Sequence, residues 1–211
     1  MKKLLLAFVL IVSTSVQAQE LDADYFRAPL DIPLYLSGNF AELRSSHFHS
    51  GLDFKTQGRE GLNVYAVADG HVSRIKVSPY GYGNALYIDH PNGMTSVYAH
   101  LSQYSDSITS FLIQAQYDLE SFEVDLYPDS GLLKVRKGEI IGLSGNTGSS
   151  GGPHLHFEVR ETKTEFPVNP LLFNFDIKDH VKPEIINVMV IPMIEGKSLD
   201  DERKIYPCSS T

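Results

Sequence analysis

Between residues 50 and 160, turns that contain glycine divide the sequence into short segments of strand length. The predicted strands are 63–68, 71–77, 85–89, 95–100, 139–143 and 154–160. Asp69-Gly70 and Pro91-Asn92-Gly93 are turn sequences, and Asp69-Gly70 predicts that the first two strands form a hairpin. Short strands at this spacing are typical of a mainly β fold, so we expect an antiparallel β-sheet or an open barrel-like core.

Other segments depart from this pattern. In residues 105–122, apolar side chains recur at steps of three and four, which predicts a helix with one buried stripe. Residues 144–152 are rich in glycine and serine and are expected to form a loop. Residues 19–40 are expected to be an irregular lead-in that wraps the domain. Residues 176–211, with a predicted strand at 185–191, are expected to be either a docking tail or the start of a second, truncated β domain.

Residues 1–18 have the pattern of a signal peptide. Lys2 and Lys3 form a positive n-region, residues 4–12 are apolar, and Val16-Gln17-Ala18 is a cleavage sequence of the small-x-small type. The apolar run is too short for a membrane anchor, so we expect no stable membrane insertion after cleavage. The protein is therefore expected to be exported, to the periplasm or cell envelope.

Charge and cysteine content narrow the possible partners. The formal net charge is -8, and removal of the first 18 residues would take away two lysines and no acidic residue. Because phosphate binding needs clustered Lys and Arg, we expect no nucleic-acid partner. Cys208 is the only cysteine, so an internal disulfide is excluded and the fold must depend on its core, with or without a metal ion.

Five polar residues carry the candidate chemistry. His49 and Asp53 are four positions apart, so on an extended chain their side chains face the same side. His154 and His156 share a face of the predicted strand that they open, while Leu155 and Phe157 take the opposite face. His100 ends another predicted strand.

Each motif alone is common, but their combination suits a metal site. Two His and one Asp can bind zinc and leave a fourth position for a water molecule, whose pKa zinc lowers to about 7. Two more His then remain for proton transfer and for stabilising an oxyanion. The sequence contains neither His-Glu-x-x-His nor Gly-x-Ser-x-Gly, which argues against helix-based zinc proteases and α/β-hydrolases.

The order of these motifs resembles that of the lysostaphin/LytM-type zinc metalloendopeptidases, which are peptidoglycan endopeptidases. The resemblance covers about residues 35–175. The matching motifs are His49-x-Gly-x-Asp53, Tyr98-Ala99-His100-Leu101, Gly145-Asn146-Thr147-Gly148 and Gly152-Pro153-His154-Leu155-His156-Phe157-Glu158-Val159.

The resemblance implies an antiparallel β-sheet core with an open groove in a zinc endopeptidase domain at 41–175. It implies that His49, Asp53 and His156 bind Zn²⁺, and that His100 and His154 flank the water, as general base, as oxyanion donor or in alternation. The implied substrate is peptidoglycan. Together with the export signal, this leads us to expect hydrolysis of D-alanyl–diaminopimelate cross-links rather than pentaglycine bridges.

In the family, a hairpin like 135–142 follows the Tyr-Ala-His-Leu strand closely, so residues 102–134 are a helical insertion here. It either walls the groove or packs on the far side. Arg44 is a candidate ligand for a substrate carboxylate or a surface charge, and Asn146 a candidate substrate contact in the groove wall. His47 is a candidate spare ligand, whereas His71, His90 and His180 are expected to be solvated.

Two other classes of protein share features with this sequence. Relatives that have lost zinc ligands bind peptidoglycan or activate other wall hydrolases without catalysis, but all five positions are filled in this chain. The hairpin at 135–142 also resembles a biotinyl or lipoyl carrier domain, but no lysine occupies a hairpin tip in the sequence context of that family.

Overall fold

The computed structural model describes residues 21–179, 187–190 and 204–207. The chain divides into two units, residues 1–177 and 178–211. The expected signal peptide, His180 and Cys208 lie outside the described residues. Within the described part of the chain, no helix has the length and apolar character needed to cross a membrane.

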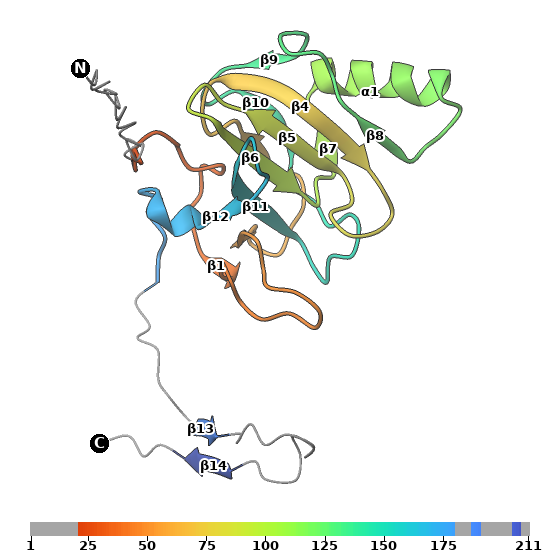
Figure 1. The fold of residues 1–211 in the computed structure, drawn as a ribbon. Helices are drawn as coiled ribbons and strands as arrows, with labels where there is room; N and C mark the ends of the chain where they lie inside the picture. The colour runs from red at the N-terminus through yellow and green to blue at the C-terminus, as the bar shows by residue number, and fades with distance from the viewer. Residues whose placement is uncertain (1–20, 180–186, 191–203, 208–211) are drawn as a thin grey trace, which may run out of the picture. The chain divides into compact units, whose positions relative to one another are not determined.

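The first unit contains fourteen of the regular elements (Figure 1). They are β1 (Leu36–Gly38), β2 (Leu52–Lys55), β3 (Asn63–Tyr65), β4 (Gly70–Val77), β5 (Ala85–Asp89), β6 (Met94–Ala99), β7 (Gln103–Tyr104), α1 (Asp106–Asp118), β8 (Val124–Leu126), β9 (Lys134–Val135), β10 (Ile140–Leu143), β11 (His154–Glu161), β12 (Pro167–Val168) and the short 3₁₀ helix η1 (Pro170–Leu172). In the second unit, β13 (Asn187–Val190) pairs antiparallel with β14 (Lys204–Pro207), and β13 lies within the strand predicted at 185–191. The domain limits and the nature of the tail stay predictions.

The main sheet has the strand order β1-β2-β11-β6-β5-β4-β8, with β12 added to β11 and β9 to β4. A smaller sheet has the order β3-β10-β7. All the pairings between these strands are antiparallel, which confirms the predicted mainly β fold with one helix.

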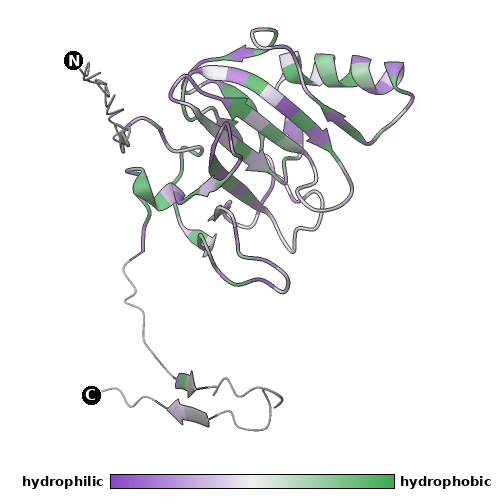
Figure 2. Cartoon of the chain, viewed as in Figure 1, coloured by the Kyte–Doolittle hydropathy of each residue, from purple (hydrophilic) through white to green (hydrophobic). Residues whose placement is uncertain are grey.

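One face of the main sheet packs into the hydrophobic core. On β11 the alternate residues Leu155, Phe157 and Val159 are fully buried in it, as predicted for the face opposite the two His. Val64 of β3 and Ile141 of β10 bring the smaller sheet into the same core. Figure 2 shows hydrophobic and hydrophilic residues alternating along β4. The other face of the main sheet carries a smaller buried apolar cluster, formed by Ala85, Tyr87, Val97 and Ala99, beside its polar side chains.

The lead-in contributes to this core. Phe26, Leu30 and Leu34 are almost fully buried, and the ring of Phe26 packs edge-on against Phe173 at a centroid distance of 4.7 Å. The segment therefore closes one side of the core, and its residues 36–38 form β1, which pairs with β2.

The predicted hairpin between 63–68 and 71–77 is wrong. β3 pairs with β10, whereas β4 pairs with β5, β8 and β9. The backbone after β3 is already bonded elsewhere, because the Ala66 amide donates to Glu139 and its carbonyl accepts from Gly138. Asp69-Gly70 thus carries the chain from the small sheet to the large one.

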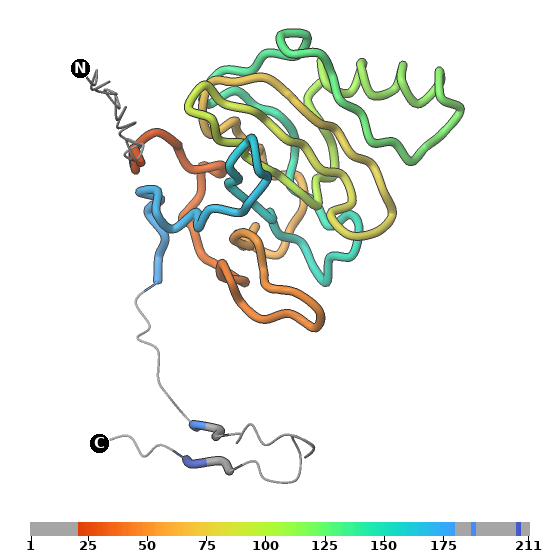
Figure 3. The backbone as a smooth tube through the Cα atoms, in the orientation of Figure 1, coloured from red at the N-terminus to blue at the C-terminus, as the bar shows by residue number. Residues whose placement is uncertain are grey.

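The insertion lies at the far edge of the main sheet (Figure 3). β8 pairs with β4. It lies four strands from β11 in the order of the sheet, a separation of about 19 Å at the usual strand spacing. Ile108 and Leu112 of α1 are buried in the core, but Phe122, expected in the same stripe, is exposed. The helix therefore packs on the core side, which favours the second of the two expected placements.

Candidate metal and catalytic site

Three neighbouring strands position the site. Asp53 on β2 lies directly opposite His156 on β11, and His156 lies opposite Ala99, the last residue of β6. His100 follows at once. Gly51 allows His49 to approach, because a Cβ atom there would lie 2.2 Å from the carbonyl oxygen of Phe157. The sheet register thus brings together residues that are up to 107 positions apart in sequence.

The side chains of His49, Asp53 and His156 converge on one point. His49 Nε2 lies 3.0 Å from His156 Nδ1 and 3.1 Å from Asp53 Oδ1, and the latter two atoms are 2.9 Å apart. All three residues are buried. In a tetrahedral site with metal–ligand distances near 2.0 Å, ligand atoms are about 3.3 Å apart. The donor set and its spacing therefore fit a zinc-sized ion.

Hydrogen bonds orient the imidazoles of His49 and His156 for metal binding. His49 Nδ1–H donates to the carbonyl oxygen of Asn39 at 2.8 Å, and His156 Nε2–H donates to Glu158 Oε1 at 2.8 Å. These bonds fix the tautomers, so that the remaining nitrogen of each ring directs a lone pair at the common point. The site is thus preorganised by the protein itself.

Glu158 is the centre of a buried network that sequence reasoning did not identify. Its side chain is fully buried and also accepts hydrogen bonds from Ser50 Oγ at 2.6 Å, Arg160 Nε at 2.6 Å and the Tyr82 hydroxyl. Burial alone would raise the pKa of Glu158, but the bonds from His156 and Arg160 hold that pKa well below its usual range. The signal was present in the sequence, because residues 154, 156, 158 and 160 share one face of β11.

Arg44 contacts a candidate metal ligand. Its Nη2 atom donates to Asp53 Oδ2 at 2.9 Å, the oxygen that does not point at His49 and His156. Gly38 leaves the space for this pair, since a Cβ atom there would lie 2.4 Å from both atoms. A role for Arg44 in binding substrate stays a prediction.

His100 and His154 lie beside the three converging side chains. Their ring centroids are 4.7 Å apart, and His154 Nε2 is 3.5 Å from Asp53 Oδ1. The Nδ1–H groups donate to the carbonyls of Thr147 and Gly152, both at 2.8 Å. The Nε2 atom of each ring therefore remains for the site, and that of His154 already faces Asp53. Burial lowers the pKa of His100 to about 4, so this imidazole is neutral at pH 7.

The loop at 144–152 supports His100. Thr147 Oγ1 accepts from the amide of Asn84 and donates to the carbonyl of Leu101. Gly148 packs against Gly83 so closely that a Cβ atom on Gly148 would lie 2.3 Å from the Gly83 nitrogen. Asn146 is on this loop, and its buried Oδ1 has no hydrogen-bond partner among the described residues. Its role in substrate binding stays a prediction.

Among the described residues, His47 and His90 have contacts away from the site. The expectation that His90 is solvated is wrong. His90 is buried, with hydrogen bonds to the carbonyl of Asp69 and to Ser96 Oγ, both at 2.8 Å. The turn after β5 folds this residue back over the core, where a polar ring must find partners. His47 is exposed and contacts Ser46.

A cavity of about 610 Å³ opens beside the converging side chains. Arg44, Asp53 and His154 line one part of it, and residues 151–153 another. Of the candidate metal ligands, Asp53 thus faces this cavity, next to His154.

Comparisons with known proteins agree with this geometry. The sequence profile of Peptidase family M23 matches residues 47–113 and 131–170, just over half of the chain, and leaves out part of the insertion. The "DD-carboxypeptidase/endopeptidase Mpg" of Neisseria meningitidis is 39% identical over 61% of this chain and 23% of its own length. The "Peptidoglycan DD-endopeptidase ShyA" of Vibrio cholerae is 33% identical over 63% of this chain and 26% of its own length. The chain thus spans about a quarter of these relatives.

Among solved structures, a "zinc containing peptidase from vibrio cholerae" matches with a TM-score of 0.51 and 28% identity, over 70% of this chain and 39% of that chain. The "SpoIIQ-SpoIIIAH pore forming complex" matches with a TM-score of 0.52 and 21% identity, over 74% of this chain and 95% of that chain, which shows a shared fold alone. Taken with the site geometry, the family match is decisive: this chain belongs to Peptidase family M23.

Proposed function

We propose that the protein is a zinc-dependent endopeptidase that hydrolyses peptidoglycan cross-links. The observation that carries the proposal is the convergence of His49 Nε2, Asp53 Oδ1 and His156 Nδ1 within 3.1 Å of one another, beside the imidazoles of His100 and His154. The names of the Neisseria and Vibrio relatives, a DD-carboxypeptidase/endopeptidase and a peptidoglycan DD-endopeptidase, support this substrate class.

His49, Asp53 and His156 are the residues that would hold the ion. Zinc bound there would supply Lewis acidity and would lower the pKa of a water molecule to about 7. The hydrogen bonds to Asn39 and Glu158 keep both rings in the tautomers that this ligand set requires. Arg44 occupies the second oxygen of Asp53 and so favours binding through one oxygen only.

His100 and His154 are the proposed catalytic groups. With Nδ1–H bonded to a backbone carbonyl, each ring can accept a proton at Nε2 or, once protonated, donate a hydrogen bond to a developing oxyanion. His154 is the nearer of the two to Asp53 and is therefore the better candidate for the general base. His100, which burial keeps neutral, accepts a proton less readily.

Within the class, we infer cleavage of D-alanyl–diaminopimelate cross-links in the periplasm or cell envelope. The support is the signal-peptide pattern of residues 1–18 and the printed names of the relatives. All five site positions are filled, which favours catalysis over a role as a non-catalytic activator of other hydrolases.

Digestion of chemically defined peptidoglycan, with the products identified by mass spectrometry, tests the proposal. Diaminopimelate cross-linked dimers should be converted to monomers, and His154→Ala protein should leave them intact. Efficient hydrolysis of pentaglycine bridges with untouched diaminopimelate dimers would contradict the proposed cross-link. Intact substrates of both kinds with zinc-loaded protein would contradict catalysis.

A further inference from the structure

The face of the main sheet that carries the site extends well beyond it. On β11, Arg160 lies on the same side as His156, four residues away, or about 13 Å along the strand. The pairing register places Glu158 opposite Val97, Val97 opposite Tyr87, and Tyr87 opposite Arg74. Because directly paired residues share a face, this row runs from β11 to β4 on the side of the sheet where the metal ligands lie.

A pocket of about 250 Å³ lies at the end of this row. Its lining includes Arg74, Tyr87, Asp89, Arg160 and, from the insertion, Tyr127. Tyr127 follows β8 directly, so the insertion reaches the open face with this residue although its helix packs on the core side. The pocket is thus partly built by a segment that interrupts the family match.

Aromatic rings and acidic side chains hold the two guanidinium groups of the pocket in place. The Arg74 guanidinium lies 4.9 Å from the ring centroid of Tyr87 and 5.3 Å from that of Tyr127. Asp125 accepts from both Nε and Nη2 of Arg74, at 2.7 and 2.6 Å. Arg160 lies 5.8 Å from the Tyr87 centroid and is bonded to Glu158. Both guanidinium groups are therefore already fixed before a ligand binds, so binding does not have to order them.

The hydrogen-bonding groups left over in the pocket include several donors. Among the described residues, Arg74 Nη1 and the hydroxyl of Tyr87 have no hydrogen-bond partner, and Arg160 Nη1 has only the exposed Glu165 at 3.9 Å. Burial raises the pKa of Tyr87, so its hydroxyl stays protonated. Three acidic residues also line the pocket. Asp89 uses Oδ1 to accept from Ser73 and Thr95, Glu161 uses Oε2 to accept from Thr164, and Glu165 is exposed. Both guanidinium groups already have an acidic partner, so the unpaired donors of Arg74, Tyr87 and Arg160 are the groups that can bind a carboxylate ligand.

We propose that this pocket, completed by Tyr127, is a subsite for a free carboxylate of the stem peptide and gives the enzyme a preference for substrates in which that group is not amidated. The inference rests on the proposed function. An extended peptide spans the distance from His156 to Arg160 in about four residues. Glutamate and diaminopimelate residues of stem peptides carry carboxylates outside the peptide bonds, whereas pentaglycine bridges carry none.

A pair of cross-linked dimers, one with free and one with amidated stem carboxylates, tests the subsite with the full-length protein. The wild type should show kcat/KM about tenfold higher for the free dimer, the ratio expected for one charge-assisted hydrogen bond. Arg74→Gln should bring that ratio close to one, and Tyr87→Phe should lower it without removing a charge. Zinc content should not change in either variant.

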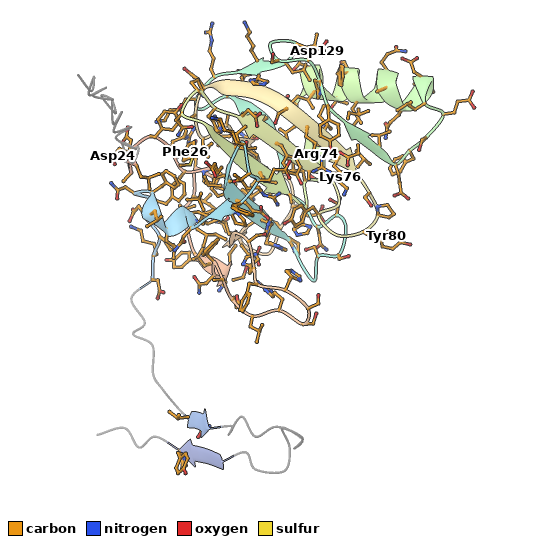
Figure 4. The ribbon with its side chains drawn as sticks, viewed as in Figure 1. Asp24, Phe26, Arg74, Lys76, Tyr80 and Asp129 are labelled. Carbon is orange, nitrogen blue, oxygen red and sulfur yellow. The ribbon has the colours of Figure 1, made fainter. Side chains whose placement is uncertain are left out.

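Lys76→Gln is the matched control. Lys76 is on the same strand and the same face, two residues from Arg74, but does not line the pocket (Figure 4). This variant should keep the tenfold ratio. Loss of the ratio in this variant as well would show that the preference depends only on the overall charge of the protein, and it would overturn the proposal. Equal cleavage of both dimers by the wild type would overturn the subsite but not the proposed function.

Binding of the same dimers to His154→Ala protein, measured by calorimetry, separates the two claims further. A tenfold difference in Kd that disappears in the His154→Ala, Arg74→Gln double variant supports the subsite even if no cross-link is cleaved. Equal Kd values for the two dimers would contradict it.

Discussion

Replacement of Glu158 by Gln removes the charge of the buried carboxylate and keeps nearly the same side-chain shape. Glu158 is fully buried and accepts the Nε2–H of His156 at 2.8 Å. The carboxylate raises the basicity of His156 Nδ1, the nitrogen that faces Asp53 and His49. A neutral amide can still accept one hydrogen bond, but it loses the electrostatic part of that effect.

The expected effect on zinc affinity is a 10- to 100-fold loss, the range observed when partners of metal-binding His are changed, or about 1.4–2.7 kcal/mol. A second effect falls on stability. Arg160, whose side chain is largely buried, would lose the charged partner that its Nε contacts at 2.6 Å. Leaving a buried charge without its partner costs about 3 kcal/mol or more, so the variant should also unfold more easily without metal.

Competition for zinc against a chromophoric chelator measures the affinity, and circular dichroism with urea denaturation measures the stability. Glu161→Gln, an exposed change on the same strand, is the matched control and should behave like the wild type. If Glu158→Gln bound zinc as tightly as Glu161→Gln, the proposed role of Glu158 in orienting and polarising His156 would be refuted.

Three further changes test other parts of the site. His100→Asn keeps a residue that tolerates the positive φ of 60° found there, and removes a group whose pKa burial lowers from 6.5 to about 4. Because the unfolded chain binds that proton first as the pH falls, the wild type should lose about 2 kcal/mol more stability than the variant between pH 7 and pH 5; equal losses in urea denaturation would contradict the assignment. Gly51→Ala should abolish zinc binding, since the new Cβ would lie 2.2 Å from the Phe157 carbonyl, and a variant with normal zinc content would show that strand spacing is not critical. Arg44→Gln should weaken zinc binding roughly tenfold by freeing Asp53 Oδ2, whereas a raised KM with unchanged zinc affinity would assign Arg44 to the substrate instead.

Local patterns in the sequence were sufficient for the six strands predicted between residues 63 and 160, whereas the set of candidate ligands came from the resemblance to a known family. The alternation in β11 places His154 and His156 on one face because a strand has a period of two residues, and no tertiary information is needed for that. The same period also places Glu158 and Arg160 there. Their importance was missed because burial and the contacts with Ser50 and Tyr82 depend on segments that are distant in sequence.

Strand pairing was the weaker part of the prediction for the same reason. The turn dipeptide Asp69-Gly70 is compatible with a hairpin, but the partners of β3 and β4 are decided by which sheet each strand can join. The contact between Arg44 and Asp53, the burial of His90 and the pocket around Tyr87 are likewise set by long-range register. A single sequence carries no direct signal for these features.

The central claim is that His49, Asp53 and His156 hold one zinc ion. Measurement of zinc content by mass spectrometry, on full-length protein purified without a His-tag, tests it most directly. We predict one zinc per chain in the wild type and in His154→Ala, and little or none in His49→Ala, Asp53→Ala and His156→Ala. Loss of zinc from His154→Ala together with its retention in His156→Ala would contradict the assignment.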